Sequence, residues 1–458
     1  MSNLPDFASI SDTLLRQEIL NFFENQANQI AQLTKALELA NQEIARLKGQ
    51  PKKPHFSSSN QSSISVTGLL KDKRNWKKKA KDVPVDQHVK VPEQEVCECG
   101  SKKFRFLRTK TKVVQGMIIK RNNIAYHGRE KQCVNCGKIY KSSFPKGSFD
   151  STLQALMSQL KFDGRFSHLL TYRFLRGFNI QISYGEITEI IRHNSNKLLP
   201  ALNHLKTKGV SQSSFLQSDA TGAKRRLKNG KVINQHLNFL GHKLLSIFKI
   251  TGKYNALEMN KLLGVNGRKK LLVSDDGSPN NACTCKGLQL CLVHEIRLYK
   301  KLFPFLTPHQ KLQQKILFEW RQFYHLAKEY GSDPPETATL TKREEIENMF
   351  DRITQQMTGY NDLDKQLRLS LKKKPKLLYF LDHPEVPIQN NESELSLREG
   401  VIMREISGPT KSVAGDRSIE RHLSVIQTIK KQGLPVFETL HGLLTGQLSP
   451  AILTLKIV

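Results

Sequence analysis

Apolar residues recur at helical spacing from about Leu14 to Leu47, and in the second half of this stretch they fall at the a and d positions of a heptad repeat. We therefore expect residues 1–49 to form a helix that pairs with a second copy of the chain as a short parallel coiled coil. An amphipathic helix packed on the body of the protein is the alternative, because fewer than four heptads are clean.

A second helical stretch, residues 150–208, precedes the β-rich part of the chain. The pattern after Arg176 is typical of a helix, a turn, a capping Ser183 and a second helix. A helix pair of this kind reads DNA in some proteins, whereas in many others it packs on a neighbouring domain. Both roles stay open for this region.

After Phe215 apolar and polar residues alternate, which predicts three antiparallel strands. A helical pattern and a short apolar run follow, which predict a helix and a buried parallel strand. This order is that of a ribonuclease-H-like core, so we expect an α/β multidomain protein whose catalytic domain comprises residues 209–306 and 378–432. The long polar helices predicted in residues 307–377 would be an insertion in that domain, and residues 433–458 a C-terminal tail.

Three acidic positions stand where this fold would gather them. Asp219 closes the apolar run of the first strand, and Asp275 closes the buried fourth strand, which is adjacent to the first in such a core. The two carboxylates would face one another and could share a divalent metal ion. Strand alternation favours Asp275 over the neighbouring Asp276. Two asparagines would cap a later helix and aim Glu394 at the aspartates, with Glu392 as the rival ligand.

A helical stretch after the second acid carries Cys291, His294 and Arg297 on one face. His294 could lie near a scissile phosphate, and Arg297 could clamp one of its oxygens. A buried cysteine and a capped histidine would explain the same residues without catalysis.

The chain carries 72 Lys and Arg against 41 Asp and Glu, a net charge of +31 that is commonest in proteins that meet phosphate backbones. No apolar stretch approaches the ~20 residues that span a bilayer, and the first residues lack the features of a signal peptide. We therefore expect a cytoplasmic protein without membrane contact, whose partner is double-stranded DNA. Cysteines in that compartment are more naturally metal ligands or buried thiols than disulfides.

Residues 91–145 contain two cysteine knuckles, each followed by a glycine, which predicts a tetrahedral structural zinc site. The expected ligands are Cys97, Cys99, Cys133 and Cys136. The segment between the knuckles alternates like strands, which indicates a zinc ribbon. One residue separates the first pair, where two are commoner, and four free thiols are the alternative.

Basic residues near these elements are candidates for contacts with DNA phosphates, and one aromatic residue among them could stack on a base. In the flexible basic linker of residues 50–90 these are Lys71, Lys73, Arg74, Trp76, Lys77, Lys78 and Lys79, and in a predicted hairpin they are Lys224, Arg225 and Arg226. A solvated tail is the alternative for the linker.

The order of these motifs resembles that of bacterial transposases of the insertion sequence 66 family, over nearly the whole chain. The likeness includes the leucine-zipper start, the paired cysteines, the signature that begins at Cys291, and Asn390-Asn391 with a glutamate three residues on. That register favours Glu394 over Glu392.

Two positions depart from the family pattern. Arginine commonly follows the glutamate, whereas Leu395 stands here, so the phosphate contact would move to Arg398. A single Asp-Gly is usual in the second motif, and Asp275-Asp276 leaves that ligand open.

The resemblance implies a DNA transposase of the DDE type, which binds terminal repeats, cuts DNA strands and joins the freed 3′ ends to target DNA by two-metal phosphoryl transfer. It implies Mg²⁺ or Mn²⁺ ions, with Asp219 bridging them, Asp275 holding one and Glu394 the other, and no covalent enzyme intermediate. It also implies a homodimer or higher oligomer associated with the bacterial nucleoid. A nuclease of the same fold that never joins DNA, a decayed DNA-binding protein without catalysis, and a role on RNA are the alternatives.

Overall fold

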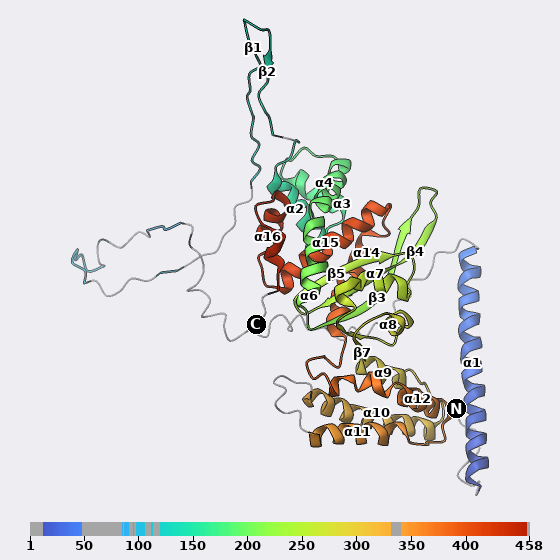
Figure 1. Ribbon diagram of the computed structural model, residues 1–458. Coiled ribbons are helices and arrows are strands. Elements are labelled where there is room, and N and C mark those ends of the chain that lie inside the picture. Colours follow the sequence, from blue (N-terminus) through green and yellow to red (C-terminus); the bar gives the residue numbers. More distant parts are fainter. Residues whose placement is uncertain are drawn as a thin grey trace. The chain divides into compact units, whose positions relative to one another are not determined.

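The computed structural model (Figure 1) describes residues 12–47, 120–145, 147–330 and 340–455, with short stretches between residues 85 and 112. The chain divides into two compact units, Met1–Ile30 with Asn123–Val458, and Ala31–Asn122. The basic linker residues predicted to meet DNA, Lys71 to Lys79, lie outside the described residues, as does Cys97.

A five-stranded mixed sheet forms the core of the larger unit, in the order β5-β4-β3-β6-β7. Its strands are β3 (Phe215–Arg226), β4 (Val232–His242), β5 (Leu245–Thr251), β6 (Leu271–Ser274) and β7 (Gly287–Leu290). β3, β4 and β5 pair antiparallel, and β6 and β7 run parallel to β3. The predicted mixed α/β architecture is confirmed, including the parallel strand beside the first one.

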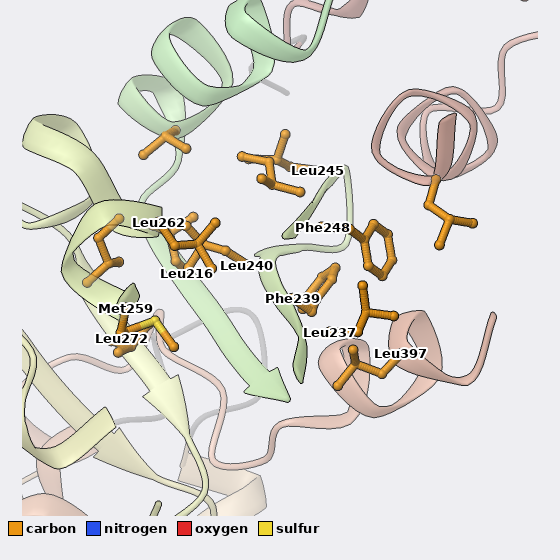
Figure 2. Close-up of a cluster of buried hydrophobic side chains, with 14 of the residues drawn as sticks. Leu216, Leu237, Phe239, Leu240, Leu245, Phe248, Met259, Leu262, Leu272 and Leu397 are labelled. Carbon is orange, nitrogen blue, oxygen red and sulfur yellow. The ribbon is translucent and has the colours of Figure 1, made fainter. Parts of the chain in front are cut away.

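Helices pack on both faces of this sheet, because side chains alternate from one face to the other along each strand. The main ones are α7 (Ala256–Gly267), α14 (Asn391–Ser407) and α15 (Val413–Lys431). Leu216 and Leu240 lie with Met259 of α7, whereas Leu237 lies with Leu397 of α14 (Figure 2). Glycine at position 400 allows α14 to come this close, since a Cβ there would lie 2.1 Å from Cδ2 of Leu237.

The edge strand β5 is covered by α15, which satisfies its outward N–H groups with side chains one helical turn apart. The bonds run from Ser246 N to Thr428 Oγ1 (3.0 Å), from Phe248 N to Ser424 Oγ (2.8 Å) and from Ile250 N to Glu420 Oε1 (2.8 Å). α15 is therefore a structural part of the sheet.

The predicted helical region before the sheet consists of α2 (Ser151–Phe162), α3 (His168–Gly177), α4 (Tyr184–Lys197), α5 (Leu199–His204), a π-helical turn (Leu205–Gly209) and α6 (Val210–Gln212). Ser183 caps α4 as predicted, in a capping box with Glu186. The segment expected to be a tail contains α16 (Val436–Thr445), which packs against α2, and a 3₁₀ turn (Pro450–Leu453).

A helical layer follows the sheet strands and includes the residues 307–377 predicted to be an insertion, whose bounds stay a prediction. It contains α9 (Leu292–Lys300), α10 (Thr307–Tyr330), α11 (Leu340–Thr354), α12 (Asn361–Lys372), α13 (Lys374–Leu377) and a 3₁₀ turn (Tyr379–Leu381). The short α8 (Ser278–Ala282) lies between β6 and β7 and packs against α7. Trp320, Phe323 and Phe350 are fully buried and form the aromatic core of the helical layer. In the described part of the chain no helix is both long and apolar enough to cross a membrane.

The first half of α1 (Thr13–Leu47) packs on this helical layer. Glu24 is 1% exposed, and its carboxylate accepts hydrogen bonds from the N–H groups of Phe305 (2.6 Å) and Leu306 (3.1 Å) and pairs with His309 (3.2 Å). Further along α1, Leu33 and Leu37 are exposed. Packing on the body thus explains the first half, and coiled-coil pairing of the second half stays a prediction.

The second cysteine knuckle lies in the turn between two short paired strands, β1 (Lys131–Gln132) and β2 (Ile139–Tyr140). Gly137 has a φ of +71°, and its N–H donates to the carbonyl of Cys133, which closes the turn after Cys136.

Candidate active site

Asp219 and Asp275 follow a cross-strand pair on two adjacent parallel strands. Ser218 of β3 is opposite Ser274 of β6, so each aspartate is the next residue after this pair. The Ser218 hydroxyl is turned to Met259 of α7, and since side chains alternate, Asp219 faces the other side of the sheet. The register thus gives the two aspartates equivalent positions, although Asp219 lies within a strand that continues beyond it.

Asp219 is partly buried and close to two other carboxyl groups. Burial is the main cause that raises its pKa to about 7, and the charges of Asp275 and Glu394 raise it further. A hydrogen bond from the N–H of Ala220 (2.7 Å) and the charge of Arg297 act in the opposite direction. The Asp219 carboxylate is therefore destabilised until a cation approaches it.

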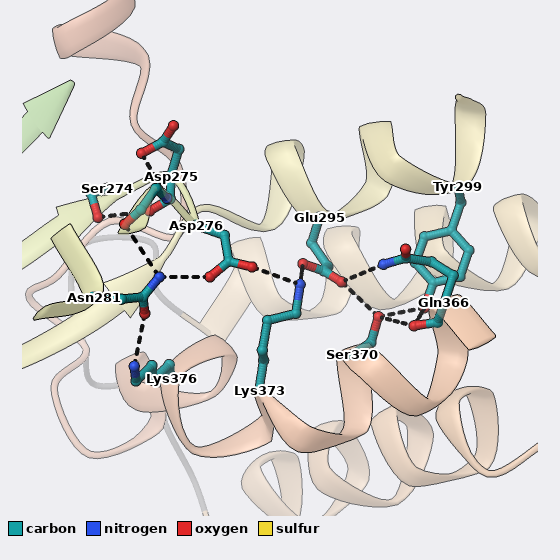
Figure 3. Close-up of polar contacts among 11 residues, drawn as sticks. Ser274, Asp275, Asp276, Asn281, Glu295, Tyr299, Gln366, Ser370, Lys373 and Lys376 are labelled. Atoms are coloured by element: carbon teal, nitrogen blue, oxygen red, sulfur yellow. Dashed lines mark hydrogen bonds and ion pairs between the residues drawn. The ribbon is translucent and has the colours of Figure 1, made fainter. Parts of the chain in front are cut away.

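The neighbouring aspartates Asp275 and Asp276 have different partners. The Asp275 carboxylate accepts a hydrogen bond from Asn280 Nδ2 (2.9 Å). Asp276 accepts one from Asn281 Nδ2 (2.8 Å) and forms an ion pair with Lys373 (3.2 Å; Figure 3). Asp276 is thus engaged by the helical layer.

Lys373 joins two parts of the site that the sequence does not connect. Its ammonium group contacts both Asp276, in the loop after β6, and Glu295, in α9 (Figure 3). Glu295 is only 3% exposed, and it also accepts hydrogen bonds from Ser370 Oγ (2.6 Å) and Gln366 Nε2 (3.2 Å). The lysine therefore holds the Asp275 loop and α9 together, a role that the sequence analysis missed because nothing in the pattern marks one lysine among many.

Asn390 ties the start of α14 to the strand that carries the first acid. It is fully buried, and its side-chain amide donates to the carbonyl of Ser218 (2.9 Å), the residue before Asp219. Its side-chain oxygen accepts from Ser393 Oγ (2.8 Å), and Asn390 makes no side-chain cap bond to the helix backbone. The expected cap is therefore replaced by a cross-link that positions the first turn of α14, where Glu394 lies.

Glu394 is held by the face of α9 that the sequence analysis singled out. Arg297 Nη1 lies 3.0 Å and His294 Nε2 3.5 Å from its Oε1. Burial lowers the pKa of His294, so the imidazole is neutral near pH 7. The rival Glu392 instead pairs with Lys431 (3.5 Å).

Cys291, the third member of that signature, is buried and has a structural position. It follows Leu290 of β7, which is opposite Ser274, and its sulfur accepts from the N–H of Asn390 (3.3 Å). Burial raises the pKa of its thiol. Cys291 thus supports the Asn390 cross-link as a neutral thiol.

The basic residues of the hairpin and of α14 differ in their surroundings. Arg225 is paired with the buried Asp416 (2.9 Å), whereas Lys224, Arg226 and Arg398 are exposed. The exposed residues remain candidates for phosphate contacts.

The carboxyl groups have the chemistry of a divalent-metal site, but they are not drawn together around one point. No group of three or more His, Cys, Asp or Glu side chains within the described residues is arranged to hold a metal ion. One feature nevertheless fits a cation: burial and the charges of Asp275 and Glu394 raise the pKa of Asp219. Asp219, Asp275 and Glu394 are the residues that could hold Mg²⁺ or Mn²⁺.

Sequence comparison gives the class of protein to which these elements belong. Residues 146–418 match the family described as "Transposase IS66 family", so the chain belongs to that family of transposases, as the resemblance in its motifs predicted. It is also similar to the uncharacterized protein y4jO of Sinorhizobium fredii (strain NBRC 101917 / NGR234), with 36% identity over 191 residues, which cover 40% of this chain and 54% of that protein. The chain thus spans about half the length of this curated relative.

Proposed function

We propose that this protein is a DNA transposase of the DDE type, which binds the terminal repeats of a bacterial insertion sequence, cuts DNA strands and joins them to a target. The proposal rests above all on the register of β3 with β6, which gives Asp219 and Asp275 equivalent positions on adjacent strands. The Asn390 cross-link supports Glu394 as the third acid, and the contacts of Asp276 and Glu392 with lysines argue against those two alternatives.

Each side chain has a distinct part in this proposal. Asp219, Asp275 and Glu394 would hold Mg²⁺ or Mn²⁺ ions, which would supply activation of the attacking oxygen and stabilisation of the leaving one. Arg297, beside Glu394, would donate to a non-bridging phosphate oxygen. His294, neutral near pH 7, would accept a proton at this end of the site. No serine or tyrosine nucleophile is required.

The finer architecture belongs to the same proposal. The catalytic core would be ribonuclease-H-like with a helical insertion, in the domain boundaries predicted above, and the end of α1 would pair two chains as a coiled coil. A zinc ribbon is supported by the knuckle at Cys133, where N–H groups of Cys136 and Asn135 lower the pKa of the thiol. Zinc analysis tests it, with Cys285, a free thiol between α8 and β7 that lies outside both knuckles, as the control position. One Zn²⁺ per chain is expected, lost in Cys136→Ser and kept in Cys285→Ser, and equal zinc in both variants would contradict the assignment.

The central experiment measures cleavage of a DNA fragment that carries the ends of the element, with Mg²⁺ or Mn²⁺. Asp219→Asn, Asp275→Asn and Glu394→Gln should each reduce cleavage at least 1000-fold while DNA binding remains, because each removes a ligand charge. Asp276→Asn and Glu392→Gln are the matched controls and should retain cleavage. Wild-type cutting by Asp219→Asn would remove the basis of the assignment.

Two further outcomes separate the alternatives. Pre-cut ends that are never joined to target DNA would indicate a nuclease of the same fold. Full DNA binding by the wild-type protein without any metal-dependent cleavage would indicate a decayed transposase. Tighter binding to RNA than to DNA in a competition assay would indicate that the basic residues bind RNA.

A further inference from the structure

A cavity of about 470 Å³ lies between the helices that precede the sheet and the outer part of the β3–β4 hairpin. Its walls come from α2, α3 and α4 on one side and from β3, β4, α14 and the start of α15 on the other. Figure 1 shows α3 and α4 close to α14 and α15 in this region. The volume falls in the range of sites that bind small molecules. None of the candidate catalytic side chains lines the cavity, so it is separate from the acidic site.

The charged side chains that line this cavity are all cations, and no carboxylate lines it. They are Lys161, Arg192, Lys224, Arg404 and Lys411. Arg192 is neutralised by Glu189. For the ammonium groups of Lys161, Lys224 and Lys411, which we call the lysine cluster, the described residues offer no hydrogen bond or ion pair. Lys161 Nζ lies over the ring of Phe162, 5.7 Å from its centroid. An anion bound here would compensate charges for which the described residues offer no carboxylate partner.

Lys161 makes this argument strongest, because its surroundings are the most desolvated of the cluster. Burial lowers the pKa of its ammonium group to about 8. A cation that loses water contacts without gaining a carboxylate is stabilised by an incoming anion more than an exposed lysine is. The cavity therefore favours a ligand that carries negative charge.

The rest of the wall is mixed: serine and threonine hydroxyls, Gln235 and His168 line it beside apolar side chains and an aromatic ring. Leu237 of β4, Met403 of α14 and Ile419 of α15 line it, together with the ring of Tyr184 at the start of α4. A bare phosphate ion would leave these surfaces in contact with water. A ligand that matches the whole cavity has an anionic group and a flat, largely apolar body.

The cavity lies along the same two elements that carry the acidic site. Ala223 of β3, which lines it, is four residues beyond Asp219, or about 13 Å at the rise of a strand. Met403 of α14 is nine residues beyond Glu394, again about 13 Å at the rise of a helix. The lining of both elements begins closer to the acids, at Gly222, about 10 Å along β3 from Asp219, and at Gly400, about 9 Å along α14 from Glu394. The separation therefore corresponds to about three to four stacked nucleotides at 3.4 Å each.

We propose that this cavity binds a nucleotide, with its phosphate at the lysine cluster and its base against the apolar side chains of the wall and Tyr184. The nucleotide is either an unpaired residue of the DNA strand whose cut phosphate lies at Asp219, or a free mononucleotide. The strand source rests on the proposed function, whereas binding of a mononucleotide does not.

Calorimetric titration of the full chain tests the site, with Asp219→Asn present in every protein so that no DNA is cut. dAMP and dTMP should bind at least tenfold more tightly than inorganic phosphate or adenosine. Lys161→Met and Lys411→Met should each weaken this binding about tenfold, and Lys197→Met, on the exposed side of α4, should not. Ala414→Trp should block binding because Ala414 lines the cavity, and Val413→Trp is its control, since Val413 is 51% exposed and does not line it.

A second titration identifies the source, with a blunt duplex and the same duplex carrying a four-nucleotide 3′ overhang. A gain of about tenfold from the overhang that disappears in Ala414→Trp assigns the site to the DNA strand. No gain, with mononucleotide binding intact, assigns it to a free nucleotide. Affinities for nucleotides and overhang that are unchanged in Lys161→Met, Lys411→Met and Ala414→Trp would overturn the proposal, as would phosphate that binds as tightly as dAMP. Since these proteins all lack the first acid, such a failure would leave the catalytic proposal standing.

Discussion

Arg297 donates a hydrogen bond of 3.0 Å from Nη1 to Oε1 of Glu394, which joins two helices across 97 positions of sequence. The guanidinium also lowers the pKa of Asp219, whereas Glu394 and Asp275 raise it. A single cation therefore balances a group of acids that repel one another.

Replacing this arginine should slow catalysis without preventing DNA binding. Arg297→Met is expected to reduce DNA cleavage about 100-fold, because a charged donor aimed at developing phosphate charge is lost. The cleavage rate of Arg297→Lys should lie between those of Arg297→Met and wild type, since lysine keeps the charge but lacks the planar guanidinium group. Steady-state cleavage and gel-shift binding measure the two effects, and equal activity of Arg297→Met and wild type would contradict the role.

The raised pKa of Asp219 has a consequence for stability in the absence of metal. The folded carboxyl holds its proton up to about pH 7, whereas an unfolded one releases it near pH 4. The stability that this proton contributes is present at pH 4 and is lost as the pH rises through 7. Asp219→Asn should therefore be more stable than wild type at pH 8 by about 2–4 kcal/mol, with the difference shrinking by pH 5.

Urea unfolding with EDTA at the two pH values measures this difference. Asp276→Asn, whose carboxyl is already paired with Lys373, is the control and should show no such trend. If the difference in free energy of unfolding between Asp219→Asn and wild type does not change with pH, the Asp219 carboxyl is not the titrating group.

Asn390 and Asn391 are neighbours in sequence but should differ sharply when replaced. Asn390→Ala removes the buried bond to the Ser218 carbonyl, which should lower the free energy of unfolding by about 1–3 kcal/mol and cleavage by at least tenfold. Asn391→Ala, at an exposed position, should change neither by more than a small amount. Similar losses in both variants would favour a capping role of the pair, as the sequence suggested.

The stability lost when Lys373 is replaced should be recovered in part by a second substitution at Glu295. Lys373→Met leaves Glu295 buried without its cation, which should cost about 3–5 kcal/mol of stability. Adding Glu295→Gln removes the unpaired charge and should recover a substantial part of that loss. The exposed Lys372→Met is the matched control, and a double variant no more stable than the single one would show that the pair is not coupled.

The sequence pattern predicts the elements that depend on a repeating arrangement of apolar residues, and it does not predict the features that depend on a single side-chain contact. Alternation after Phe215 predicts the strands, because one face of each is buried, and the order of elements predicts β6 beside β3. By contrast, nothing local distinguishes Lys373 from the other lysines, and an asparagine before a helix suggests a cap when the actual partner lies 172 residues away.

The packing partners of the C-terminal segment and of α1 could not be predicted for the same reason. Residues 433–458 are short and lack a long periodic pattern, so α16 was not anticipated, yet it finds its apolar partner in α2. In α1 a heptad pattern describes the apolar stripe but not what covers it. Packing decides that question, and the burial of Glu24 in the structure shows that the first half has a fixed partner.

The two carboxylate oxygens of Glu24 accept hydrogen bonds from the N–H groups of Phe305 and Leu306, so α1 and the helical layer depend on each other for these bonds. Grafting the N-terminal segment of a relative onto this chain at the linker would strand two buried donors whenever the graft lacks an acceptor at that position. The safe junction for such chimaeras lies after Ile30, where the larger unit ends its share of α1. The second half of α1 could then be exchanged between relatives while the larger unit keeps its own first 30 residues.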